Sequence, residues 1–335
     1  MSTLSIANPT LLDFTKELGP NGKIITDIAE VLNLTNEILP EMTVTEGNLT
    51  TGHKFLMRTG IPSPTWLKVN GFLQPGKATT IPVQQSCGHL ASLCQIDPLL
   101  GNLGNNLEAF RRNQEVAHIE GMSEEMAQTL FSGNEATEPE AFTGFGPYYN
   151  LSTGNENSCN VLKTTEDSAS TNSDIWLIGW GPTKIHGFFP QGSQAGLKYT
   201  DLGTQLIAGT TAGTMAVRLS SQFEWDLGLA IEDWRYAARA HWGTTSADTY
   251  ISAGTGTTLI NQMIQMTELM PSLTNCRPVF YMSRTGLTKL RLQTLRAVSN
   301  TLTFETVGGK PVTMFNGIPV RRCDAILNNQ AALTA

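Results

Sequence analysis

LEAFRRNQEVAHIEGMSEEMAQTLF, residues Leu107 to Phe131, is the stretch that decides the fold. Its apolar residues recur at steps of three and four, which is the spacing of one helical face. They are Val116, Ile119, Met122, Met126 and Leu130. Gly121 is tolerated inside the pattern and Gly133 closes it. The pattern predicts one helix of about 25 residues, about 40 Å long, which suits a spine better than a compact core.

The residues before this helix carry too little apolar surface to fold alone. Residues 1–43 contain two short helical patterns, Pro9 to Leu18 and Ile28 to Leu39, and we expect Pro40 to end the second. Residues 44–95 are rich in turns and alternate around Lys54 to Arg58 and Thr79 to Val83, which predicts a long hairpin. Short helices and isolated two-stranded ribbons are marginal in water, so both segments need a partner surface.

Two strand signals follow the helix, after a polar loop at Ser168 to Asp174. The first is Ile175 to Pro190. The second is Phe223 to Trp242, whose apolar face switches sides at Asp233 and Trp234, as a bulge or sharp twist would allow. The final third is mixed. It predicts helices at Thr257 to Met270 and Arg284 to about Arg296, a buried strand at Arg277 to Met282, and strands around Leu302 to Thr306 and Gly317 to Arg322.

The composition favours self-association and disfavours nucleic-acid binding. Only 15% of the 335 residues are charged, against about 25% in typical proteins, and a monomer usually relies on interspersed charges for solubility. The 22 basic and 29 acidic residues give a net charge of −7 without any basic block. We therefore expect no tight DNA contact, and helical pairing of Arg111 and Arg112 with Glu108 and Glu115.

Neither a leader pattern nor a membrane-length apolar run is present in the sequence. We expect synthesis in a cytosol, where all five cysteines stay free thiols.

The motifs that carry chemistry are incomplete. HIE at 118–120 lacks the PCxxC half of a zinc deaminase signature, and GTGTT at 254–258 lacks the ending of a phosphate loop. QGSQAG at 191–196 fits a nucleophile elbow only loosely and is expected to be a turn. Cys87 and His89, with Gly88 between them, suggest a Cys-His dyad. We expect structural roles for both residues instead. Packing roles are likewise expected for the isolated histidines His53, His186 and His241. We predict no catalytic, cofactor or metal site.

Several long stretches together resemble one family. They are residues 46–80, residues 103–150, FEWDLGLAIEDWRYAAR at 223–239, RPVFYMSRTGLTKLRLQ at 277–293 and VTMFNGIPVRRCDAIL at 312–327. Taken together, these stretches resemble the major capsid protein of short-tailed bacteriophages, which has the fold shared by tailed-phage and herpesvirus shells. The resemblance runs from about residue 7 to residue 330.

This resemblance implies an α+β fold in four parts. They are an N-terminal arm at 1–43, an extended hairpin or E-loop at 44–95, a peripheral domain with the spine helix and a β-sheet at 96–250, and an axial domain at 251–335. The strands at 175–243 would form the peripheral sheet. In most of the fold their equivalents follow the GIPV strand, so the segment order here looks permuted.

The resemblance also implies a non-enzymatic subunit without cofactors. Such subunits assemble into the hexamers and pentamers of an icosahedral bacteriophage head, a virion shell that encloses double-stranded DNA and is built in the host cytoplasm. The implied partners are other copies of the chain, a separate scaffolding protein and a portal protein, with a decoration protein as an optional addition and no membrane. Two alternatives stay open: a cytosolic hydrolase with an unrecognised nucleophile, and a tail-tube or baseplate protein.

We expect two groups of residues to contact neighbouring subunits. The arm would bury Leu11, Leu12, Phe14, Ile28, Val31 and Leu32 on a neighbour. The hairpin would be anchored by Trp66, with Lys54, Arg58 and Lys68 beside it. Interlocked arms rather than covalent links would then hold the shell, and a chain lacking residues 2–40 would keep the remaining fold.

Overall fold

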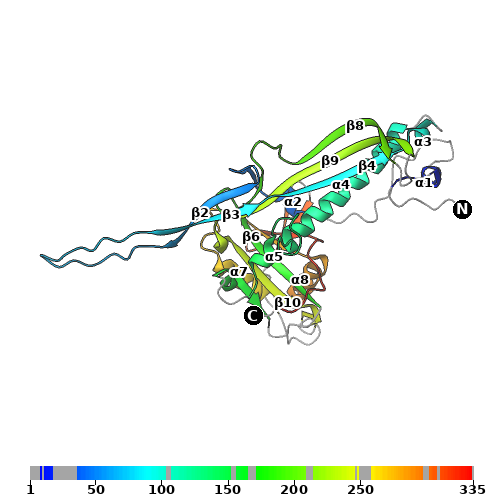
Figure 1. The fold of residues 1–335 in the computed structure, drawn as a ribbon. Helices are drawn as coiled ribbons and strands as arrows, with labels where there is room; N and C mark the ends of the chain where they lie inside the picture. The colour runs from blue at the N-terminus through cyan, green and yellow to red at the C-terminus, as the bar shows by residue number, and fades with distance from the viewer. Residues whose placement is uncertain are drawn as a thin grey trace.

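A computed structural model describes residues 8–9, 11–17, 36–102, 107–151, 156–164, 171–208, 214–245, 247–248, 258–296, 302–307 and 310–333. Within these ranges the chain is a mixed α+β protein in which one long helix crosses the body and one hairpin projects from it (Figure 1). No helix of the described part combines the length and apolar character that a membrane crossing requires.

The predicted spine helix is confirmed as α4, Leu107–Ser132. Met122, Met126 and Leu130 are buried as expected, while Val116 is 40% exposed. Phe110, which lies outside the predicted stripe, is fully buried because it faces strands on one side and the N-terminal segment on the other. The spine is therefore buried near its start at Phe110 and again from Met122 to Phe131, while residues 111–121 between them are half-buried or exposed.

Three long strands lie along α4 (Figure 1). They are β4 Gly88–Ile96, β8 Leu197–Ala208 and β9 Met215–Ile231. β9 pairs antiparallel with both of the others, so it is the central strand of this layer. β8 was not predicted, because its exposed positions occur on both faces and leave no apolar alternation to detect.

The second part of the body consists of seven further strands of the same 12-stranded sheet with two helices against them, and the short strands β1 and β5 complete that sheet. Its elements are β6 Asn172–Trp180, β7 Ile185–Phe189, β10 Ala237–Gly243, β11 Arg277–Met282, β12 Leu302–Val307, β13 Lys310–Phe315, β14 Ile318–Arg322, α7 Leu259–Leu269 and α8 Arg284–Arg296. All nine residues of β6 are buried, because its two faces contribute to two different cores. A strand covered on both sides has a continuous rather than alternating apolar pattern.

The strand predictions need three corrections. The expected loop at Ser168 to Asp174 ends early, because β6 already begins at Asn172. The expected strand from Ile175 to Pro190 is two strands, with a turn at 181–184 between β6 and β7. The break after β9 is a 3-10 turn, η2 Trp234–Tyr236, rather than a bulge. The Asp233 carboxylate accepts a hydrogen bond from the backbone N–H of Arg235, which turns the chain there.

The expected boundary at residue 250 does not coincide with a break in the sheet. β6 pairs along its length with β10 on one side and β11 on the other. The strands assigned by resemblance to the peripheral sheet are thus continuous with strands of the expected axial part. β13, which pairs with β12 and β14, was also not predicted.

The N-terminal segment is anchored to its own chain where it is described. Its helices are α1 Leu11–Lys16 and α2 Ile38–Glu41. Pro40 lies inside α2, which ends at Glu41, and so does not end the helix as expected, because the first turn of a helix tolerates the missing N–H of proline. Residues 28–35 of the predicted helix lie outside the described residues, and Asn36 forms an isolated bridge with Cys323, so the predicted helix is wrong at residues 36–37.

The predicted hairpin is confirmed in a shorter form. It consists of β2 Gly52–Gly60 and β3 Thr79–Ser86, which form a separate two-stranded sheet. Residues 87–96, expected in the hairpin, belong to β4 in the body. The remaining short elements are β1 Val44–Glu46, α3 Pro98–Asn102, α5 Phe145–Tyr148, η1 Glu156–Asn160 and β5 Val161–Lys163.

Candidate functional site

The hairpin end carries large apolar side chains that are almost fully exposed. Residues 61–78, between β2 and β3, project far from the body (Figure 1). Trp66 is 102% exposed, Phe72 99%, Val69 92% and Ile61 83%. Soluble monomers rarely gather so much exposed apolar surface in one place unless it meets a partner.

Local sequence explains the extended tip. Pro62, Pro64 and Pro75 have no N–H to donate, so this part cannot continue the ladder of β2 and β3. The chain reverses where the Gly71 N–H donates to the Lys68 carbonyl at 2.9 Å. Asn70 takes a positive φ of 63° in this turn, a conformation that asparagine tolerates better than most residues.

The hairpin is also basic in an acidic protein. Residues 47–96 contain Lys54, Arg58, Lys68 and Lys77 and no acidic residue, which leaves 18 basic and 29 acidic residues elsewhere, a charge of −11. Lys54, Leu56 and Arg58 share the exposed face of β2. Within the described part of the chain none of these four cations forms a salt bridge with an acidic residue. The surface is thus both apolar and positively charged.

The base of the hairpin, in contrast, is fixed to the body. The Ile231 N–H donates to Gln85 Oε1 at 3.0 Å, and Ser86 Oγ donates to Glu135 at 2.8 Å. The side chain of Asn48 holds the backbone of Lys54 from both sides, accepting at 2.8 Å and donating at 2.6 Å. A fixed base and a free tip give a projection with a defined direction.

His53 and His186, expected to be isolated, meet at this base. His53 lies on β2 and His186 on β7, and their ring centroids are 5.5 Å apart. His53 Nε2 lies 3.3 Å from Glu232 Oε1. Burial, and secondarily the neighbouring His53, lowers the pKa of His186 to about 4. Linear spacing held no signal for this cluster, since its members come from three separate segments.

The spine helix and the residues that follow it carry a negative charge, opposite to that of the hairpin. Residues 107–140 contain eight acidic residues and only two basic ones, Arg111 and Arg112. Glu108, Glu125, Glu138 and Glu140 among them are exposed. An acidic surface of this kind can attract a basic projection from another copy.

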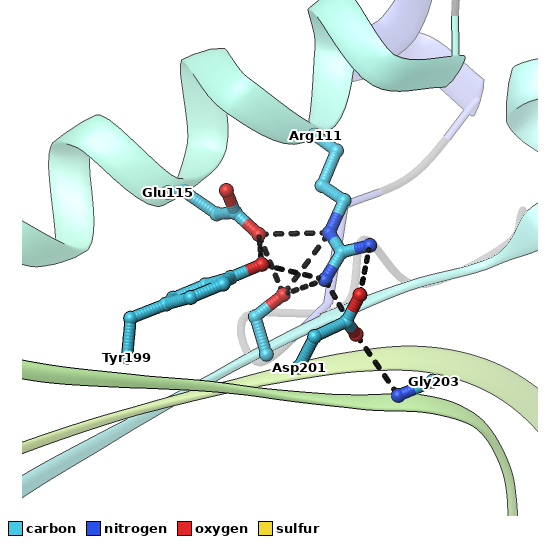
Figure 2. A network of polar contacts seen from close by, with 6 residues as sticks. Arg111, Glu115, Tyr199, Asp201 and Gly203 are labelled. Atoms are coloured by element: carbon cyan, nitrogen blue, oxygen red, sulfur yellow. Dashed lines mark hydrogen bonds and ion pairs between the residues drawn. The ribbon is translucent and has the colours of Figure 1, made fainter.

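Arg111 joins the spine to the strands beside it (Figure 2). Its guanidinium contacts Glu115 at 2.7 Å, which confirms the predicted helical pair, and also Asp201 at 2.8 Å, Tyr199 at 3.0 Å and Ser221 at 2.6 Å. The expected pair of Arg112 with Glu108 is not formed among the described residues. Arg112 and Glu108 are both exposed.

The predicted contact residues separate into three groups. Lys54, Arg58, Trp66 and Lys68 are exposed on the hairpin, where a neighbour can reach them. Phe14, expected to be buried on a neighbour, is only 1% exposed within its own chain, because it packs edge to face on Phe110 at 5.3 Å. Ile28, Val31 and Leu32, and the side chains of Leu11 and Leu12, lie outside the described residues.

The residues that suggested chemistry do not form a catalytic arrangement in the described part. Ser193 and His89 both bond the Asp226 carboxylate, at 2.6 Å each, so that the serine and the imidazole are not paired with each other. Burial raises the pKa of the Cys87 thiol to about 12, which keeps it protonated. His118 donates to or accepts from Ser92 at 2.7 Å, and the turn predicted at residues 191–196 is confirmed by a positive φ at both of its glycines.

The arrangement of spine helix, long strands and projecting hairpin is that of a tailed-phage capsid subunit. A chain in the near-atomic cryo-EM structure of bacteriophage Epsilon15 is 30% identical, with all of both chains covered and a TM-score of 0.79. The capsid of bacteriophage JBD30 is 10% identical, with 96% of this chain and 99% of that chain covered and a TM-score of 0.52, which supports the fold alone. No curated protein matches the chain.

A family model described as major capsid protein GP7 matches residues 19–334, and the chain belongs to this family. The predicted fold class and the predicted role in a phage particle are thereby confirmed: the chain forms the capsid shell of a virion. The hydrolase and tail-tube alternatives gain no support from these comparisons.

Proposed function

We propose that the subunits assemble into hexamers and pentamers of an icosahedral head that encloses double-stranded DNA, with the hairpin of one subunit lying on the spine helix of the next. The observation that carries this proposal is the hairpin tip, where Trp66 and Phe72 expose essentially all of their surface. Burying two aromatic side chains stabilises an interface by several kcal/mol, since each covers about 150–250 Å².

Charge supports the same pairing. The four cations of the hairpin, which form no salt bridge within the described residues, would meet residues 107–140, which contain six more acidic than basic residues. Each exposed ion pair contributes only about 0–1 kcal/mol, so the aromatic residues supply affinity and the charges supply orientation and partner choice.

The four-part division into arm at 1–43, hairpin at 44–95, peripheral domain at 96–250 and axial domain at 251–335 remains our proposal, as does the permuted segment order. In this division the peripheral and axial parts share one sheet, because β6 pairs with both β10 and β11. We further propose a separate scaffolding protein and a portal protein as partners, with a decoration protein as an optional addition. A purely structural role without catalysis is also part of the proposal.

Replacing the tryptophan tests the interface. Trp66→Ala should give a soluble, folded subunit that fails to build shells, because Trp66 makes no contact that the isolated fold needs. Electron microscopy of the assembly reaction shows shells directly, and circular dichroism reports the fold.

The matched control is Trp66→Phe, which keeps an aromatic anchor and should retain most of the assembly. If Trp66→Ala assembles normal heads, the hairpin tip is not the anchor. If both variants are unfolded, the tip contacts its own chain and the proposal is equally wrong.

A further inference from the structure

We propose that His53, His186 and Glu232 form a binding site for a divalent transition-metal ion, of which zinc fits best, at the base of the hairpin. One ring nitrogen from each histidine and one carboxylate oxygen of Glu232 all lie within 4.8 Å of one another. No other group of three such side chains was found in the described part of the chain.

The donor set selects the class of metal. Two imidazoles and one carboxylate are typical zinc ligands, whereas calcium and magnesium prefer oxygen donors alone. The Zn–N and Zn–O bonds are about 2.0–2.2 Å, so neighbouring ligand atoms in a tetrahedral site are about 3.4 Å apart. The 3.3 Å from His53 Nε2 to Glu232 Oε1 already meets this spacing. The other distances between ligand atoms are at most 4.8 Å, so side-chain rotation has to shorten them by about 1.4 Å at most.

The histidines have unsatisfied nitrogens in this cluster. Nδ1 of His53 and Nδ1 of His186 are buried and have no hydrogen-bond partner among the described residues. Buried polar atoms without partners are rare in folded proteins and each is destabilising. A cation bound among the three side chains would take a lone pair from His53 Nε2, the nitrogen that faces Glu232, and one from His186, whose Nδ1 has no partner among the described residues.

The site has a wall and an opening. His186 is 1% exposed, and Phe55 and Phe188 lie against the His53 ring at 6.1 and 5.6 Å. The side chains of His53 and Glu232 are 14% and 24% exposed, which leaves access for the ion and for a water as fourth ligand.

The three ligands come from three elements. His53 belongs to the hairpin strand β2, His186 to β7, and Glu232 follows β9, where its N–H donates to the Lys184 carbonyl at 2.9 Å. A bound ion would therefore tie the projecting hairpin to the body at the point that sets its direction. This inference does not depend on assembly, and the free subunit suffices to test it.

The test uses the full chain without a histidine tag, stripped with EDTA and titrated with ZnCl2 by calorimetry. Co²⁺ replaces Zn²⁺ in a second titration, because its visible absorption reports tetrahedral coordination. The wild-type chain should bind one ion per subunit, and Zn²⁺ should raise its thermal midpoint by mass action.

The variants Glu232→Gln and His53→Gln change partly exposed positions and should weaken binding at least about tenfold each. The controls Glu224→Gln and His89→Gln alter the same residue types outside the cluster and should bind like the wild type. A wild-type chain that binds no Zn²⁺, or binding that both cluster variants leave unchanged, overturns the proposal.

Discussion

The buried carboxylate of Asp174 connects two neighbouring strands in the middle of the sheet, β6 and β10. Asp174 on β6 accepts from Arg239 at 2.7 Å and contacts His241 Nδ1 at 2.7 Å, and all three residues are buried. Arg239 also donates to the Tyr149 carbonyl at 2.9 Å and lies over the Trp176 ring. Burial alone would raise the pKa of Asp174, but the charge of Arg239 and the hydrogen bonds from His241 and Arg239 hold it below its ordinary value.

Asp174→Asn should therefore destabilise the subunit by roughly 3–5 kcal/mol, because it leaves Arg239 buried without its counter-charge. A carboxyl whose pKa is lower in the folded state stabilises the fold above its unfolded pKa, and that stabilisation is lost as pH falls through the folded pKa. Wild-type stability should consequently drop below about pH 4, and the variant should lose less there. Urea unfolding of the free subunit at several pH values measures both effects.

Glu224→Gln is the control for this prediction. Glu224 pairs with Lys198 at the surface, at 2.9 Å, so its replacement should change stability by less than about 1 kcal/mol. Equal effects of the two substitutions would mean that the buried network contributes no more than a surface pair.

At the scale of elements, Arg111 fastens β8 and β9 to the spine (Figure 2). It contacts Glu115 within α4, Tyr199 and Asp201 on β8, and Ser221 on β9. Arg111→Met keeps much of the aliphatic stem but removes every one of these bonds. It should cost about 2 kcal/mol or more, because the half-buried Glu115 loses its positively charged partner and keeps only the hydroxyls of Ser221 and Tyr199.

Hydrogen exchange localises that loss. In Arg111→Met the amides of β8 should exchange faster, while those of β6 and β11 should not change. Arg112→Met removes the adjacent, exposed arginine and should leave exchange as in the wild type. Faster exchange in both variants would show that the general charge of the helix, and not the Arg111 network, holds the strands.

Elements with one regular apolar pattern were predictable and the others were not. The spine, β11 and α8 follow from periodicity, and the structure bounds the last two at Arg277–Met282 and Arg284–Arg296 as predicted. β8 was missed because both its faces are largely exposed. The long-range contacts were beyond reach, since Phe14 on Phe110 and His53 with His186 depend on the tertiary fold and not on spacing.

At the scale of the whole molecule, charge is divided between the hairpin and the remainder. The hairpin region at 47–96 carries four cations and no acidic residue, and the remainder has a formal charge of −11. Sequence composition alone showed only the net −7, because the separation matters only once the hairpin is known to project from the body (Figure 1). A subunit divided in this way attracts copies of itself in one orientation, with the hairpin toward an acidic surface.

Reversing the hairpin charges should weaken assembly without unfolding the subunit. Lys54→Glu with Arg58→Glu places two acidic side chains on the exposed face of β2, opposite the acidic spine of the neighbour. We expect assembly at low salt to be at least about tenfold weaker per contact, equivalent to about 1.4 kcal/mol. Light scattering should also show that the extent of wild-type assembly falls toward that of the variant as the salt concentration rises, since about 0.1 M salt screens exposed charges beyond about 10 Å.

Lys54→Arg with Arg58→Lys preserves the charge and should assemble normally. Adding Glu125→Lys and Glu138→Lys to the reversed chain restores opposite signs across the contact and should recover assembly. If the four-residue variant is no better than the two-residue one, the hairpin does not lie against the spine segment at 107–140, and another acidic surface attracts it.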